Sequence, residues 1–231
     1  MRSSRWHAHG NVYLLAEQAD LTPERVRAGA PGTDGIVEVL SAGDDEAEVV
    51  IWNPDGSTAE LSGNGTRIAA KWLAARTGAE TVQIRVRGGR TVTAHMLDGG
   101  LVETDMGEVE VSEPETVDGI ELIRVSVGNP HAVVRGNPDE IGRIGPLLET
   151  HERFPDRTNV QIVHVDGPGE VSGRIWERGV GETTASGTSA VAVAAATHDD
   201  GDVLVRFPGG DLRVRLEGGR AWLTGPAERL D

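Results

Sequence analysis

The chain has 231 residues, which is enough for one large domain or two small ones with a substantial core. Its formal net charge of −15 argues against a nucleic-acid partner, because proteins that bind phosphate backbones carry basic surfaces. Cysteine is absent, which excludes disulfides, thiolate metal sites and thiol catalysis. No apolar run is long enough for a membrane span, and the N-terminus lacks the apolar centre of a signal peptide. The sequence therefore predicts a cytoplasmic protein without a membrane partner.

Strand patterns dominate the first half of the chain. Thr22 before Pro23 is typical of a helix start, with threonine as the cap and proline at the first helical position. Alternating residues on both sides of Gly88-Gly89 predict a hairpin. The strands expected in this half are residues 11–16, 36–40, 48–52, 81–87, 90–96 and 101–106.

The second half follows an acidic stretch, residues 108–118, which contains a proline and is the expected crossing between two lobes. Residues 141–150 predict a helix. Strands are expected at residues 122–127, 159–165, 171–176, 203–207, 212–216 and 221–224.

A polar run at residues 53–67 leads directly into a helical pattern. Asn53-Pro54-Asp55-Gly56 is typical of a turn, and Ser62 stands where a helix N-cap belongs. Ile68, Trp72 and Leu73 then follow at helical spacing. Small residues, free backbone N–H groups and the positive end of a helix dipole suit this helix start to a carboxylate or a phosphate.

The same arrangement occurs a second time, where Ser186-Gly187 precedes a helical run of alanine and valine. In both halves the Ser-Gly pair is followed by a helix and by three strands that two Gly-Gly turns separate. This repeat predicts a lobe of residues 1–112, which the last strand at about 222–231 could complete, and a lobe of residues 113–221. We expect the two helix starts to meet across a cleft between the lobes, where small ligands usually bind.

Other motifs that would carry chemistry are incomplete or absent. Gly63-Asn64-Gly65 lacks the third glycine of a dinucleotide loop, and the chain has neither a P-loop nor a nucleophile elbow. His7 and His9 have no carboxylate companion nearby in the sequence, which favours an ordinary surface position over a metal site.

Several motifs resemble those of the diaminopimelate epimerase family. Residues 53–67 are similar to its Asn-x-Asp-Gly-Ser and Cys-Gly-Asn-Gly motifs, and residues 177–188 to its Glu-Arg-Gly-x-Gly-Glu-Thr and Cys-Gly-Thr segment. The similarity continues in order through His7-Ala8-His9-Gly10-Asn11, Gly128-Asn129-Pro130-His131, Thr158-Asn159-Val160 and Leu223-Thr224-Gly225-Pro226-Ala227.

The resemblance implies an α+β fold of two pseudo-symmetric lobes, each a mostly antiparallel sheet wrapped around a central helix. It also implies a homodimer that interconverts LL- and meso-2,6-diaminopimelate by α-proton exchange, on the route to lysine and peptidoglycan, without a cofactor or a metal. The amides expected to bind the substrate's polar ends are Asn11, Asn53, Asn129 and Asn159. Backbone at Gly63-Asn64 and Gly187-Thr188 would hold the reacting carboxylate, and Glu177 and Arg178 would make charged contacts, with a guanidinium suited to bidentate binding.

Ser62 and Ser186 stand where the family has its two catalytic cysteines. A serine hydroxyl is a much weaker acid than a thiol and needs a neighbouring group to activate it. The resemblance places His131 and Glu177 beside the reacting centre, and together with the two serines they complete the expected catalytic set.

Three accounts stay open at this point. The serines exchange the α-proton, helped by Glu182 or His131; or the chain is an isomerase or dehydratase that acts on another amino acid; or it binds an amino acid without turning it over. Each serine also fits a purely structural role as an N-cap.

Overall fold

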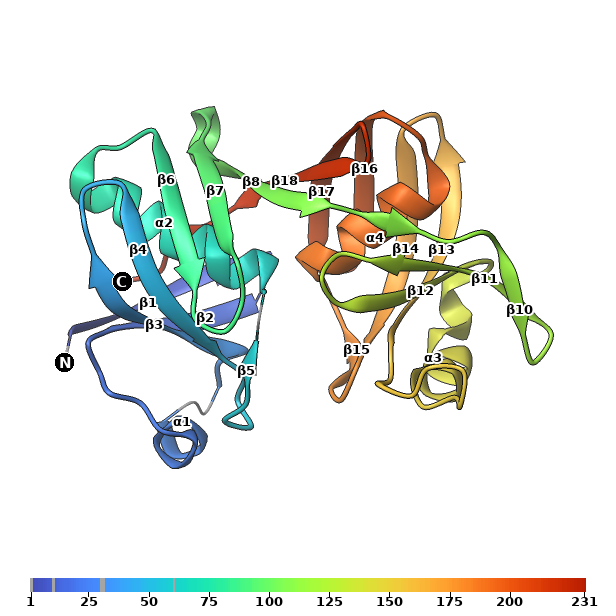
Figure 1. The fold of residues 1–231 in the computed structure, drawn as a ribbon, viewed down its shortest axis with the longest axis horizontal. Helices are drawn as coiled ribbons and strands as arrows, with labels where there is room; N and C mark the ends of the chain where they lie inside the picture. Colours follow the sequence, from blue (N-terminus) through green and yellow to red (C-terminus); the bar gives the residue numbers. More distant parts are fainter. Residues whose placement is uncertain (1, 10, 30–31, 60) are drawn as a thin grey trace. The chain divides into compact units, whose positions relative to one another are not determined.

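The computed structural model describes residues 2–9, 11–29, 32–59 and 61–231 (Figure 1). These residues form two compact units, the first made of residues 1–105 and 224–231 and the second of residues 106–223. The chain passes from one unit to the other within β8 (Leu101–Glu108) and returns within β18 (Arg220–Pro226). The first passage precedes the acidic stretch for which the sequence predicts the crossing, and within that stretch β9 (Glu110–Val111) and β10 (Glu115–Val117) both pair with β11 (Ile120–Ser126).

Unit 1 is a twisted mixed sheet with a central helix, α2 (Gly63–Thr77). Its remaining elements are β1 (Arg2–Ala8), β2 (Asn11–Glu17), α1 (Pro23–Gly29), β3 (Gly35–Ala42), β4 (Glu46–Trp52), β5 (Thr58–Ala59), β6 (Thr81–Val86), β7 (Thr91–Met96), a 3-10 turn at Asp98–Gly100, and the short β19 (Glu228–Arg229). Apolar residues of α2 and of the surrounding strands form one core, which includes Ile68, Leu73 and Ile84.

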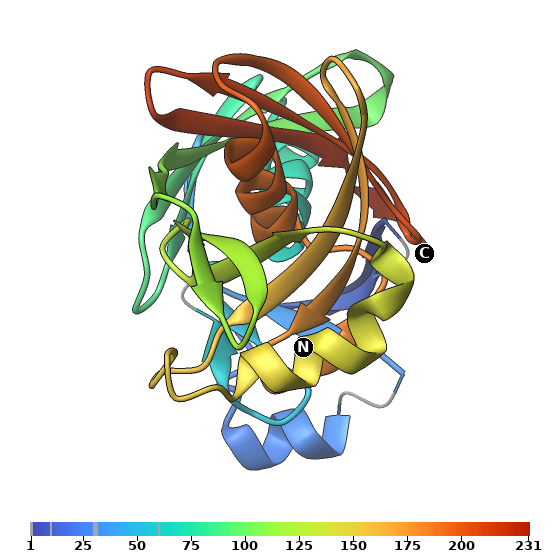
Figure 2. The same cartoon turned by 90° about the vertical axis from the view of Figure 1, so that its right-hand side faces the viewer.

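Unit 2 has the same plan around α4 (Gly187–Thr197). Its elements are β9 to β11, β12 (Pro130–Arg135), a 3-10 turn at Pro138–Glu140, α3 (Ile141–Glu149), β13 (Asn159–Gly167), β14 (Glu170–Glu177), β15 (Gly181–Thr183), β16 (Gly201–Phe207) and β17 (Gly210–Glu217). Figure 2 shows strands of this unit curving around α4, whereas α3 lies on the outside of the sheet. Since nearly every residue of α4 is buried, its run of alanine and valine needs no polar face.

Strand pairing shows the repeat directly. In unit 1, β2 runs parallel to β3 and β4 runs parallel to β6, while β1 with β2, β3 with β4 and β6 with β7 are antiparallel. In unit 2, β12 with β13 and β14 with β16 are the parallel pairs, and the antiparallel pairs also correspond. The predicted fold class, two pseudo-symmetric α+β lobes with mostly antiparallel sheets around central helices, is confirmed.

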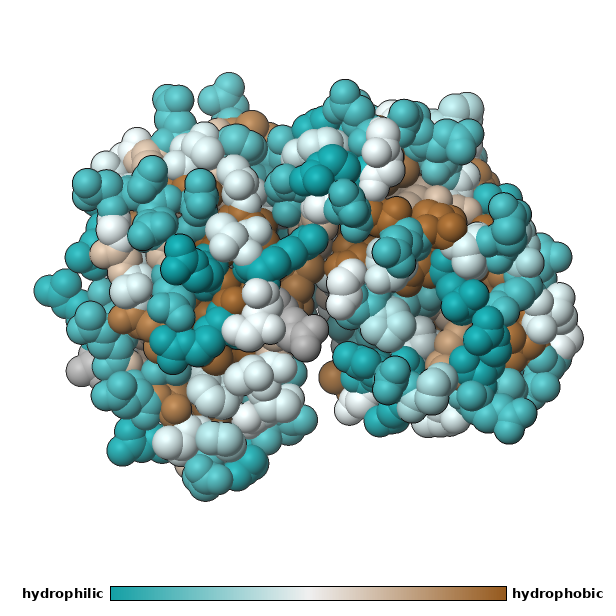
Figure 3. Space-filling view, viewed as in Figure 1, coloured by the Kyte–Doolittle hydropathy of each residue, from teal (hydrophilic) through white to brown (hydrophobic). Residues whose placement is uncertain are grey.

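Most predicted elements are present, but two of the longer strands, β1 and β12, were missed, as were the short strands β5, β9, β10, β15 and β19. The patterns around Gly88-Gly89 and at residues 141–150 form the β6–β7 hairpin and α3, as predicted. The sequence did not indicate β1, which carries two exposed arginines, or β12, which begins at a proline. Hydrophilic residues cover most of the surface of each unit on the face drawn in Figure 3, in keeping with the high charge. Within the described ranges, no helix is long and apolar enough to cross a membrane.

Candidate active site

Ser62 begins the central helix of unit 1 and caps it. Its backbone is extended (φ −138°, ψ 118°), and its hydroxyl accepts a hydrogen bond of 3.1 Å from the Gly65 backbone N–H. The Thr66 N–H bonds to the Ser62 carbonyl at 2.9 Å. The N–H groups of Gly63 and Asn64 are then the ones left for an anionic ligand at the positive end of the helix. Both of these residues are buried.

Two further side chains lie at the start of α2. The phenol of Tyr13, on β2, lies 3.4 Å from the Ser62 hydroxyl oxygen. Arg67, in the first turns of α2, is 0% exposed and donates from Nη2 to the side-chain oxygen of Asn64 at 2.6 Å. Burial lowers the pKa of the Arg67 guanidinium to about 10, whereas its interaction with Tyr13 acts in the opposite direction. Asn64, predicted to bind through its backbone, therefore has its side chain engaged by an arginine.

The predicted ligand Asn53 lies in the turn that precedes α2. Its side-chain amide donates to the Ser57 hydroxyl at 2.9 Å, and its carbonyl accepts from the Gly56 N–H at 2.9 Å. Asp55 completes the turn by accepting from the Ser57 hydroxyl at 2.6 Å, and hydrogen bonds from Ser57 lower the pKa of the Asp55 carboxyl. The predicted turn chemistry is confirmed, and Asn53 is exposed at its start.

Asn11, the other predicted ligand of unit 1, begins β2. Its amide lies 3.5 Å from the His9 carbonyl oxygen. Gly10, which belongs to the same predicted motif, lies outside the described residues.

Ser186 begins the central helix of unit 2 but does not cap it with its side chain. Its backbone is again extended (φ −147°, ψ 130°), and its carbonyl accepts from the Ala190 N–H at 3.0 Å. The hydroxyl makes no capping hydrogen bond, and the residue is 8% exposed. Gly187 and Thr188 follow it in the buried first turn, where their backbone N–H groups are suited to bind an anion.

A buried, uncharged network lies beside this helix. His131 Nδ1 is 3.0 Å from the side-chain nitrogen of Gln161, and that nitrogen also donates to the Ser189 hydroxyl at 3.0 Å. Because Nδ1 accepts, Nε2 carries the proton and donates to the Asn129 oxygen at 3.0 Å. The amide of Asn129 reaches the Thr188 hydroxyl at 3.4 Å. Burial lowers the pKa of His131 to about 3, so its imidazole is neutral at physiological pH.

Asn159 joins the two loops that carry the remaining predicted residues. Its amide donates to the Pro130 carbonyl at 2.9 Å, and its oxygen accepts from the Arg178 backbone N–H at 3.0 Å. Glu177 accepts a hydrogen bond of 2.6 Å from the Thr183 hydroxyl, and the Arg178 guanidinium donates to the Asp156 carbonyl at 3.1 Å. Each predicted ligand of unit 2 is therefore held by hydrogen bonds, and Asn159 ties the Pro130 loop to the Arg178 loop.

Sequence reasoning missed Glu149, which supports this framework from the end of α3. The carboxylate is 5% exposed and accepts from the Gly179 N–H at 2.6 Å, the Trp176 indole at 2.7 Å and Arg157 at 2.6 Å. It thereby fixes the turn after Glu177, in which Gly179 has a positive φ of 78°. Glu149 belongs to no motif, and its burial is not visible in the sequence, so nothing in the sequence pointed to it.

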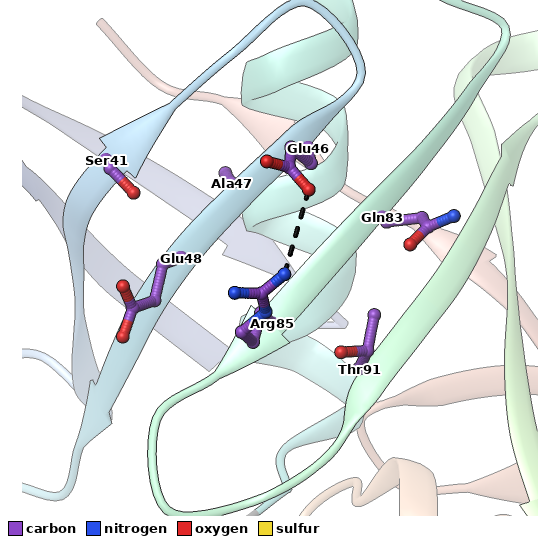
Figure 4. A pocket seen from close by; sticks show the side chains of 7 residues that line it. All are labelled: Ser41, Glu46, Ala47, Glu48, Gln83, Arg85 and Thr91. Carbon is purple, nitrogen blue, oxygen red and sulfur yellow. Dashed lines mark ion pairs between the residues drawn. The ribbon is translucent and has the colours of Figure 1, made fainter.

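A pocket on unit 1 lies away from these residues (Figure 4). It is lined by Ser41, Glu46, Ala47, Glu48, Gln83, Arg85 and Thr91, and Arg85 pairs with Glu46 at 3.8 Å. Gln83 and Arg85 are exposed on β6, whereas the intervening Ile84 packs in the core with α2. The pocket therefore opens on the face of the sheet opposite to the Ser62 helix. Among the described residues, no group of three or more His, Asp or Glu could hold a metal ion.

Comparison with known proteins decides the family. The family described as diaminopimelate epimerase matches residues 7–112 and 123–230. The chain belongs to the diaminopimelate epimerase family. It is therefore an isomerase that acts as an epimerase on an amino acid.

Relatives in this family match over the full length. The chain is 39% identical to a diaminopimelate epimerase of Desulforudis audaxviator, covering 100% of this chain and 97% of the relative. It is 32% identical to that of Synechococcus elongatus, with 100% and 96% covered. A predicted epimerase from Pseudomonas aeruginosa shares the fold with a TM-score of 0.80 at 16% identity, covering 100% of this chain and 97% of the other.

Proposed function

We propose that this epimerase interconverts LL- and meso-2,6-diaminopimelate by exchanging the α-proton, with Ser62 and Ser186 as the acid and base and without a cofactor or metal. The observation that carries the proposal is that the two serines occupy equivalent places of the repeat. Each has an extended backbone and directly precedes the buried central helix of its unit. Ordinary capping accounts for the Ser62 hydroxyl but not for that of Ser186. A role as N-cap therefore fits Ser62 and does not fit Ser186.

The helix starts would supply the stabilisation that the reaction needs most. An α-proton next to a carboxylate is a very weak acid, so the developing carbanion must be stabilised electrostatically. Backbone N–H groups at Gly63-Asn64 and Gly187-Thr188 lie at the positive ends of α2 and α4, where they suit the reacting carboxylate. This part of the mechanism does not depend on whether a thiol or a hydroxyl transfers the proton.

The other proposed substrate ligands are the amides of Asn11, Asn53, Asn129 and Asn159 with the charged groups of Glu177 and Arg178. The exposed guanidinium of Arg178 is available to bind a carboxylate at the distal end of the substrate. Glu177, whose carboxylate accepts from Thr183, would bind an ammonium group.

We infer that His131 positions other groups rather than acting as the base. Its neutral ring donates to Asn129, which in turn contacts Thr188 at the start of α4. A pKa of about 3 leaves it unable to hold an extra proton at neutral pH. His131 would thus fix the amide of Asn129 toward the substrate.

The test is α-proton exchange in D₂O, followed by NMR, with LL- and meso-diaminopimelate as separate substrates and a chelator present. Exchange with inversion supports the proposal. A product with changed connectivity would indicate an isomerase or dehydratase of another substrate, and calorimetric binding without exchange would indicate an amino-acid-binding protein.

Replacing both serines with cysteine provides a second test. We expect faster exchange in the Ser62→Cys, Ser186→Cys protein, because a thiolate is available at neutral pH. Unchanged exchange would contradict the assignment of these serines or of the substrate. The homodimer, the cytoplasmic location and the interlobe cleft stay predictions.

A further inference from the structure

We propose that Tyr13 is the proton partner of Ser62, and that the buried Arg67 stabilises the phenolate form of Tyr13. The inference rests on the proposed function and extends it by naming the group that activates one of the two serines. Tyr13 acts through Ser62 and does not touch the substrate in this account.

The first support is distance. Tyr13 is 9% exposed, and its phenol oxygen lies 3.4 Å from the Ser62 hydroxyl oxygen. Catalytic hydrogen bonds are often long in ligand-free structures and shorten when the substrate binds. A Cβ added at Gly35 would lie 2.6 Å from the Tyr13 ring, so the missing side chain at Gly35 makes room for this ring.

The second support is the charge of Arg67. Its side chain is 0% exposed, and neither Nε nor Nη1 has a hydrogen-bond partner, while Nη2 bonds to Asn64. A buried cation without enough partners is costly, and the cost is greater at the positive end of a helix. Its electrostatic interaction with Tyr13 favours the charged guanidinium. An anion beside Arg67 would offset this cost, and the Tyr13 phenolate is the one we assign to it.

The third support is the repeat. Tyr13 lies opposite Gly35 in the parallel β2–β3 pair, and His131 lies opposite Asn159 in the equivalent β12–β13 pair. Both stand two residues after an asparagine, Asn11 or Asn129. Tyr13 thus occupies in unit 1 the position of His131 in unit 2. Here the side chain reaches the helix-start serine itself.

The proton transfer balances within these groups. When Ser62 acts as base, its oxygen takes the α-proton while its own hydroxyl proton passes to the Tyr13 phenolate. The electron pair of the broken C–H bond stays on the substrate as the carbanion. In the reverse direction Ser62 donates its proton to the carbanion, and the Tyr13 phenol replaces it.

Because Tyr13 is the single tyrosine of the chain, its ionisation can be followed without interference from other phenols. We expect phenolate absorbance to appear at lower pH in the wild-type protein than in Arg67→Gln, since the variant lacks the neighbouring positive charge. Arg76→Gln, an exposed arginine at the end of the same helix, is the control and should leave the titration unchanged. Equal midpoints of the Tyr13 titration in wild type and Arg67→Gln would overturn the pairing of Arg67 with Tyr13.

Tyr13→Phe tests the proton transfer itself, because it keeps the ring. We expect kcat for diaminopimelate exchange to fall about 10²-fold with little change in KM, and the pH profile to lose the limb that belongs to the phenol. Full exchange with an unchanged pH profile in Tyr13→Phe would overturn the role of Tyr13 alone. A wild-type protein without exchange would overturn the proposed function as well, so the two failures are distinguishable.

Discussion

The starts of α2 and α4 have the same extended backbone conformation at their serines, but the side chains around them differ. The Ser62 hydroxyl lies beside the Tyr13 phenol and accepts a hydrogen bond from Gly65, and the buried guanidinium of Arg67 bonds to Asn64 in the same helix turn. In the first turn after Ser186, Thr188 bonds to Asn129, which accepts from a neutral histidine that also bonds to Gln161. A duplicated scaffold thus supplies two equivalent places, and the side chains packed behind each place set its charge. We expect Ser62 to lose a proton more readily than Ser186.

The largest effect should come from removing either hydroxyl. Ser62→Ala and Ser186→Ala should each reduce epimerisation of diaminopimelate by about 10² to 10⁴-fold, the usual contribution of a positioned acid or base. Initial rates in both directions, with circular dichroism to check folding, measure this effect. Ser41→Ala is the control, because Ser41 is exposed and lies on the face of the unit 1 sheet opposite to the Ser62 helix. Near-normal rates in either helix-start variant would contradict a two-serine mechanism.

Glu149→Gln should cause the largest loss of stability, because it weakens three hydrogen bonds around the turn after Glu177. We expect the free energy of unfolding to fall by about 2 to 4 kcal/mol, since the donors on Trp176 and Gly179 lose their charged acceptor on the buried Glu149. Urea titration measures this change. Glu140, just before α3, pairs with Arg143 and has a side chain 43% exposed; it is a control whose replacement should cost less than about 1 kcal/mol.

His131 should make stability depend on pH. Its folded pKa of about 3 lies below its ordinary value near 6.5, so the unfolded chain binds the extra proton first as the pH falls. Stability from this residue is complete above about pH 6.5 and declines toward pH 3, by up to about 1.4 kcal/mol per pH unit. Urea unfolding of wild type and His131→Gln between pH 4 and 7 should show a steeper acid loss in the wild type. Parallel curves would contradict a buried neutral imidazole.

The smallest expected effect is a difference in the free energy of unfolding between Ser62→Ala and Ser186→Ala. Ser62→Ala removes a cap and should cost about 1 kcal/mol, whereas Ser186→Ala removes no capping bond and should cost less. Thermal unfolding of the two variants under identical conditions provides the comparison. Equal losses would show that Ser186 also stabilises its helix.

Local patterns revealed most of the fold and much of the candidate site. The Gly-Gly hairpin, the start of α1 at Thr22-Pro23 and the two serine helix starts are short-range features that the sequence displays directly. The contact of Tyr13 with Ser62 joins residues 49 positions apart, and that of Glu149 with Gly179 spans 30. Such contacts depend on how strands and helices pack, so the sequence showed the residues without showing their partners.

Deuterium incorporation during the first turnovers of LL-diaminopimelate tests the central claim most directly. If one serine removes the proton and the other delivers one from solvent, the meso product carries deuterium at the inverted carbon while recovered LL substrate remains unlabelled. Deuterium appearing equally fast in recovered substrate and product would show that a single group works on both faces, and would contradict the paired roles of Ser62 and Ser186.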